Sequence, residues 1–185
     1  MTSLTEQLRE WHDFYMLVGT ASGTLVGLMF VSASIGASYY NESHRAAMRA
    51  FVSPTVMHFS AVLFICILAM VPSHTWMTLG ALLCVGGLFG DGHSGIVVFT
   101  LLVRQRFTVD ISDRMFYALV PVLGYALVLA AGILLLIQSS WSFNVIAAAL
   151  LVLLVAAIRN AWDMTLWVVI RAPTMPAPPE PPPGA

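Results

Sequence analysis

Residues Phe14 to Ala37, FYMLVGTASGTLVGLMFVSASIGA, form an uncharged stretch of about 24 residues around which the rest of the chain is organised. At ~1.5 Å rise per residue, a helix of this length would be ~36 Å long, enough to cross the ~30 Å hydrocarbon core of a bilayer with some tilt. Gly19, Gly23 and Gly27 recur every four residues and therefore lie in one row, where another helix backbone can come close. The stretch predicts a membrane-spanning helix that packs against neighbouring helices.

The composition of the whole chain agrees with this prediction. The 185 residues are 59% hydrophobic and 9% charged, with a mean hydropathy of +0.86, whereas a soluble domain carries about 25% charge. The apolar runs are continuous rather than alternating, which argues against a β-barrel. The net charge is -1 and the chain contains no lysine, so no basic surface is available for nucleic acid. We therefore expect an integral membrane protein with the lipid bilayer as its partner.

The apolar runs predict an all-α fold, an integral membrane bundle of five transmembrane helices preceded by a short N-terminal amphipathic helix. Residues 1–13 form the amphipathic segment, residues 14–172 the five-helix membrane domain, and residues 173–185 a disordered proline-rich tail. The predicted spans lie at about 14–37, 51–71, 76–103, 115–136 and 143–170.

The arginines predict the orientation of the bundle. Arg45 and Arg49 follow the first span, Arg104, Arg106 and Arg114 follow the third, and Arg171 follows the fifth. The short second and fourth loops contain neither arginine nor lysine. The positive-inside rule then places the N-terminus outside and the C-terminus inside.

Polar residues inside the spans are candidates for an ion or proton site, because charges in lipid are costly. The candidates are His58, Asp91, His93, Arg159, Asn160 and Asp163. Asp91 lies 15 residues after Trp76 and Arg159 lies 16 residues after Phe143, so both are ~22–24 Å from the outer edge at ~1.5 Å per residue. We therefore predict that Asp91 and Arg159 pair inside the bundle, with His58 and His93 close by. The alternative is a purely structural ion pair that holds helices together.

Glycines give the helix-packing candidates. Gly80, Gly87 and Asp91 share one helical stripe in the third span, as Gly19, Gly23 and Gly27 do in the first. Glycines at 90, 92 and 95 also weaken the helix around Asp91.

No pattern predicts an enzyme. Cys66 and Cys84 lie in apolar runs and fit small packing residues. Asp91 and His93 are two residues apart and do not share a helix face, so no metal site is expected. The chain has no phosphate loop, haem-attachment motif or nucleophile elbow, so we expect no cofactor and no catalytic residue. Tyr117 and Tyr125 fit an interfacial belt or the core.

Two blocks of sequence resemble a family of small, uncharacterised bacterial inner-membrane proteins. They are WHDFYMLVGTASGTLVGLMFVSASI at residues 11–35 and IRNAWDMTLW at residues 158–167, of which RNAWD is the more specific. The resemblance implies a multi-pass location in the bacterial inner membrane, and it implies no activity.

The polar candidates lead to a functional expectation. We expect an oligomeric protein that conducts or senses an ion or proton, with Asp91 as the binding group and Arg159 holding it. The histidines would titrate near neutral pH. The alternative is a non-catalytic scaffold or modulator subunit of a larger membrane complex. We expect its partner to be a second copy of the chain or another membrane protein.

Overall fold

The computed structural model describes residues 4–37, 42–104 and 111–171 of the chain. Its helices are α1 (Leu4–Glu10), α2 (His12–Ala37), α3 (Glu42–Met70), α4 (Trp76–Arg104), α5 (Ile111–Leu136) and α6 (Ser142–Arg171). Over the described residues the chain forms six helices and no strand, which confirms the prediction of an all-α fold. The predicted proline-rich tail, residues 173–185, lies outside these residues.

Two helices begin earlier than the sequence predicts. α3 begins at Glu42 rather than near residue 51, and α5 begins at Ile111 rather than near residue 115. The sequence predicts loops for these segments because they are too polar for lipid. A helix needs no apolar surroundings, however, and the alanines and methionine at 46–48 favour helix formation. The apolar helices are therefore extended by polar first turns.

Short turns with local hydrogen bonds join α3 to α4 and α5 to α6. The backbone N–H of Thr78 donates to Thr75 Oγ1 at 3.2 Å, and the backbone N–H of Thr75 donates to Thr78 Oγ1 at 2.8 Å, so the two residues cap α4 reciprocally. After α5, Gln138 adopts a φ of 54° and the N–H of Ser139 donates to the Leu134 carbonyl at 2.9 Å. This is the 6→1 bond of a Schellman motif, which ends the helix and reverses the chain.

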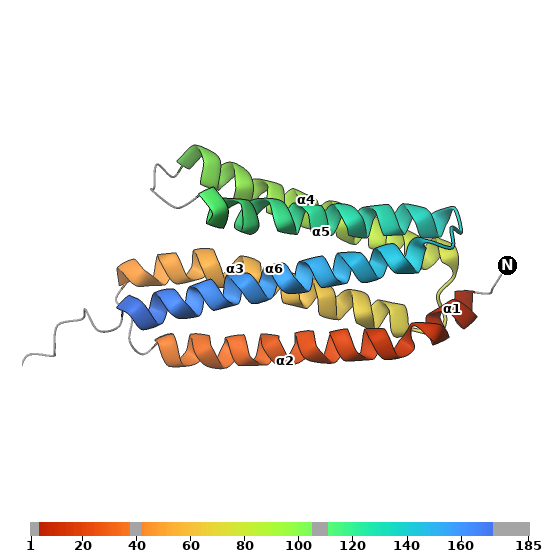
Figure 1. Cartoon of the computed structure of the whole chain (residues 1–185), viewed down its shortest axis with the longest axis horizontal. Coiled ribbons are helices and arrows are strands. Elements are labelled where there is room, and N and C mark those ends of the chain that lie inside the picture. The colour runs from red at the N-terminus through yellow and green to blue at the C-terminus, as the bar shows by residue number, and fades with distance from the viewer. Residues whose placement is uncertain (1–3, 38–41, 105–110, 172–185) are drawn as a thin grey trace, which may run out of the picture.

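The five long helices run in alternating directions along the bundle (Figure 1). α5 packs between α4 and α6, α6 also packs on α3, and α3 packs on α2. We call the end at which α1 lies and α4 and α6 begin the N-terminal end. The end at which α3 and α5 begin and α6 finishes is the C-terminal end (Figure 1).

Three described segments are long and apolar enough to cross a membrane: His12–Ser32, Leu119–Leu136 and Ser142–Asp163. A shorter apolar segment, Pro54–Met70, lies in α3. Large apolar side chains such as Phe30, Phe89 and Trp162 are exposed on the outer surface. Such a surface suits contact with lipid tails, so the described chain has the helices and the outer surface of a membrane protein.

Candidate functional site

A buried hydrogen bond joins α3 to α5 inside the bundle. His58 and Tyr125 are 3% and 2% exposed, and His58 Nδ1 lies 3.0 Å from the Tyr125 hydroxyl oxygen. The hydroxyl donates to an unprotonated Nδ1 and accepts from a protonated one, so the bond is compatible with either protonation state of the imidazole. The two rings are 5.6 Å apart between centroids. The pair forms a polar centre between two apolar helices.

Gly90 allows α4 to come close to this centre. A Cβ at Gly90 would overlap the Tyr125 ring, so only glycine leaves room for the ring in its present position. Asp91 follows Gly90 and interacts electrostatically with Tyr125, and His93 interacts electrostatically with His58. α4 therefore adds a carboxyl group and a second imidazole to the His58–Tyr125 pair.

Two polar atoms that α4 contributes are buried without a hydrogen-bond partner in the described part of the chain. They are Asp91 Oδ1 and His93 Nε2. Unpaired polar atoms are costly in an apolar interior, and in membrane proteins such groups tend to mark functional sites. We refer to His58, Asp91, His93 and Tyr125 as the polar cluster. The structure thus brings together three of the predicted site residues and adds one tyrosine.

Ser94 and Asn160 are among the other residues whose buried polar atoms have no partner in the described part of the chain. Ser94 of α4 is 4% exposed and Asn160 of α6 is 1% exposed. The Ser94 hydroxyl and both polar atoms of the Asn160 amide lack a hydrogen-bond partner among the described residues. A hydroxyl and an amide can each donate and accept, so these side chains can bind water or another small polar group.

The predicted ion pair between Asp91 and Arg159 does not form, although the structure describes both residues. Arg159 Nε instead lies 3.1 Å from Asp163 Oδ2 and 3.2 Å from Asp163 Oδ1, one turn later on α6. The side chains of Arg159 and Asp163 are 42% and 36% exposed, so the prediction of an interior Arg159 is wrong. The reason is that α4 packs chiefly on α5, whereas α6 packs on α5 and α3, so a shared depth along the bundle does not bring two side chains together.

The glycine row of α2 faces α3. A Cβ at Gly19 would lie 3.0 Å from Cys66 Cβ, and one at Gly23 would lie 3.7 Å from a Leu63 methyl group. A Cβ at Gly27 would meet no atom within 4 Å in the described part of the chain. Gly19 and Gly23 therefore serve contacts within one chain.

The glycines of α4 face α5 more tightly. A Cβ at Gly80 would lie 3.0 Å from the Gly132 carbonyl oxygen, and one at Gly87 would lie 2.7 Å from the Leu129 backbone nitrogen. Small residues thus let the two backbones approach, as is common between membrane helices. This close packing brings Gly90, the residue before Asp91, against the Tyr125 ring.

The site has neither a metal cage nor a disulfide within the described residues. No group of three or more His, Cys, Asp or Glu side chains there is placed to hold a metal ion, and Cys66 and Cys84 are free thiols. Comparison with protein-family models, with curated proteins and with solved structures finds no match to this chain. The chemistry of the polar cluster is therefore the evidence from which a function can be argued.

Sequence reasoning missed Tyr125 and Ser94 as site residues. Tyr125 lies 11 residues before the end of α5 at Leu136, ~16 Å along the helix at ~1.5 Å per residue. Tyrosines of an interfacial belt lie near the ends of a span, so this depth was the available signal. Ser94 gave no comparable signal, because serine is common at helix contacts in membranes.

Proposed function

We propose that this chain is a polytopic membrane protein that takes up protons at the polar cluster and passes them through the bundle. The observation that supports the proposal is that His58 and Tyr125 form a buried hydrogen bond and that α4 adds the half-buried Asp91 and His93 near this pair. Carboxyl, imidazole and phenol groups exchange protons in proteins. Chains of such groups inside membrane helices form the proton relays of pumps and transporters.

The proposal includes a topology. All five long helices, α2 to α6, cross the bacterial inner membrane, with the N-terminus outside and the C-terminus inside. Tyr125 is 11 residues from Leu136 and Asp91 is 15 residues from Trp76, distances of ~16 and ~22 Å along their helices. In a hydrocarbon core of ~30 Å the cluster would therefore lie near or just beyond the middle, on the cytoplasmic side.

The available side chains favour a proton over a metal cation as the transported species. A dehydrated cation requires several oxygen or nitrogen ligands arranged around it. In the described residues no three His, Cys, Asp or Glu side chains are placed to hold a metal ion together, whereas a proton needs one acceptor atom. The hydrogen bond between His58 and Tyr125 also exchanges its donor and acceptor readily, which suits a proton relay.

The proposal is tested by proton flux into liposomes that contain the purified protein. A potassium gradient with valinomycin would drive protons inward, and an enclosed pH dye would report their entry. We expect flux in the native protein and its loss in Asp91→Asn, which keeps the size of the side chain but removes proton exchange. Asp163→Asn is the matched control, because the Asp163 carboxylate pairs with Arg159 outside the polar cluster.

Two results would overturn the proposal. One is the same proton flux in the native protein and in Asp91→Asn. The other is the absence of proton flux from correctly folded native protein under any gradient, which would favour a scaffold or modulator subunit. Sodium and potassium gradients measured in the same liposomes show whether a metal cation moves instead.

A further inference from the structure

The buried polar side chains near the cluster lie mostly on one side of it. On α3, the buried Thr55 is three residues before His58. On α4, the buried Ser94 is four residues after Gly90, the residue that packs on Tyr125. Because α3 begins and α4 finishes at the C-terminal end, both displacements point toward that end, by ~4.5 Å for Thr55 and ~6 Å for Ser94 at ~1.5 Å per residue.

Asn160 continues this polar series. It lies seven residues after Leu153, whose side chain packs against Gly124, the neighbour of Tyr125. α6 runs toward the C-terminal end, so Asn160 lies ~10 Å further in that direction at ~1.5 Å per residue. Ser94 and Asn160 are both more than nine-tenths buried, and their polar side-chain atoms have no partner among the described residues.

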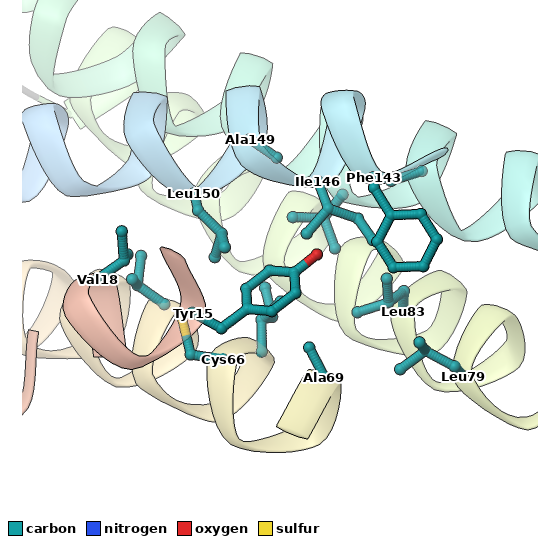
Figure 2. Close-up of a cluster of buried hydrophobic side chains, with 14 of the residues drawn as sticks. Tyr15, Val18, Cys66, Ala69, Leu79, Leu83, Phe143, Ile146, Ala149 and Leu150 are labelled. Carbon is teal, nitrogen blue, oxygen red and sulfur yellow. The ribbon is translucent and has the colours of Figure 1, made fainter. Parts of the chain in front are cut away.

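The interior on the other side of the cluster is mainly apolar, with the buried Ser142 hydroxyl at the start of α6 as an exception near the N-terminal end. Figure 2 shows Tyr15 of α2 surrounded there by side chains from α3, α4 and α6. We refer to six of the buried residues, each at most 2% exposed, as the apolar block: Tyr15, Val62, Cys66, Leu83, Val128 and Leu150. Its members come from all five long helices and lie between the cluster and the N-terminal end. The Tyr15 hydroxyl is a polar atom within it and has no partner in the described part of the chain.

We infer that water, and the protons it carries, enter the bundle from its C-terminal end past Asn160 and Ser94, and that the apolar block closes the other end. The inference rests on the proposed function and adds a direction to it. Serine and asparagine side chains both donate and accept hydrogen bonds, as water does, whereas a dehydrated cation needs acceptors alone. In this arrangement the polar cluster exchanges protons with the C-terminal side of the membrane. Protons reach the N-terminal side only if the side chains of the apolar block move apart.

Thiol labelling tests the direction without measuring flux. In a Cys66→Ala/Cys84→Ala chain, Ser94→Cys and Asn160→Cys are made singly and exposed to a membrane-impermeant methanethiosulfonate from either face of oriented vesicles. Thiols react as thiolates in contact with water, so we expect labelling from the C-terminal side at least about tenfold faster than from the other side. Leu83→Cys is the matched control from the same helix, and it should react from neither side.

The native cysteine provides a second measurement that needs no new side chain. Cys66 is 1% exposed within the apolar block, so in a Cys84→Ala chain it should stay unlabelled from both sides. Labelling of Cys66 from the N-terminal side, equal labelling of Ser94→Cys from both sides, or no labelling of Ser94→Cys and Asn160→Cys from either side would each overturn the inference. Labelling from one side only, in a protein without proton flux, would support water entry from the C-terminal end but overturn proton passage. Failure of the inference and failure of the proposed function can therefore be told apart.

Discussion

At the scale of single residues, two tyrosines with similar burial have hydroxyl groups in different surroundings. Tyr125 is 2% exposed and its hydroxyl bonds to His58 Nδ1 at 3.0 Å. Tyr15 is fully buried, but its hydroxyl has no partner among the described residues. A buried hydroxyl contributes to stability when it is hydrogen-bonded and costs free energy when it is not. The two residues therefore allow the same substitution to be compared in opposite environments.

We predict that Tyr125→Phe lowers the free energy of unfolding by about 0.6 kcal/mol and by no more than about 1.7 kcal/mol, the average and the maximum measured for hydrogen bonds between membrane helices. Tyr15→Phe should leave the free energy of unfolding unchanged or raise it, because it removes an unpartnered polar atom. Reversible unfolding in mixed micelles, followed by circular dichroism, measures both. In a His58→Ala background the cost of Tyr125→Phe should largely disappear, since its partner is gone. Equal losses for the two Tyr→Phe substitutions would contradict the prediction.

The residues of the polar cluster could be predicted from the sequence only in part. His58, Asp91 and His93 are polar groups in apolar runs, and the cost of placing them in lipid makes them visible without a structure. The residues that contact these polar groups were not predictable, because the depth of a residue along its span does not indicate which helix packs against that span. The depth of Arg159 along its span predicts a pair with Asp91, whereas Arg159 bonds to Asp163 on its own helix.

At the scale of helices, the contact between α4 and α5 depends on glycines that leave no space for a side chain. A Cβ at Gly87 would lie 2.7 Å from the backbone nitrogen and 2.9 Å from Cα of Leu129. A close contact with backbone atoms cannot be relieved by a change of rotamer, whereas a contact with the end of a flexible side chain can. Gly86 is the neighbouring residue, and a Cβ there would meet nothing within 4 Å in the described part of the chain.

We predict opposite effects for alanine at these adjacent positions. Gly87→Ala should lower the free energy of unfolding by about 1–3 kcal/mol, the usual cost of overpacking, because α4 and α5 must move apart. Gly86→Ala should be neutral or stabilising by up to ~1 kcal/mol, because alanine favours helix over glycine. Unfolding in mixed micelles again provides the measurement. The prediction fails if the two variants are equally stable, since the tight contact would then not exist in solution.

The positions of the helices along the chain were easier to predict than which helices pack against each other. Helix positions follow from uncharged runs near 20 residues long and from the prolines and polar turns between them. The polar first turns that begin at Glu42 and Ile111 are not predicted in this way, because they are not apolar. The order in which helices pack depends on complementary surfaces. Gly87 packs against Leu129 and Gly90 against Tyr125, residues far away in the chain. The periodicity within one helix does not indicate which residue of another helix it contacts.

At the scale of the whole molecule, the number of crossings decides whether the polar cluster lies inside the membrane. His12–Ser32, Leu119–Leu136 and Ser142–Asp163 are long and apolar enough by themselves, whereas α4 carries Asp91 and His93 within its apolar run. α4 nevertheless packs closely on α5 over the stretch from Gly80 to Gly90. A helix packed in this way against a membrane-spanning neighbour shares its environment, so we expect α3 and α4 to cross as well.

Ser73, an exposed residue of the turn between α3 and α4, distinguishes five crossings from three. Both numbers are odd and place the chain ends on opposite sides, so the location of the termini does not separate them. With five crossings, Ser73→Cys in a chain without native cysteines should be labelled by an impermeant thiol reagent only from the side of the N-terminus. Ser140→Cys, in the exposed turn between α5 and α6, should be labelled from that same side in either case and serves as the control. Labelling of Ser73→Cys only from the side of the C-terminus would mean that α3 and α4 do not cross. The polar cluster would then lie at a surface, and a proton relay through it would lose its physical basis, because polar groups there are solvated by water.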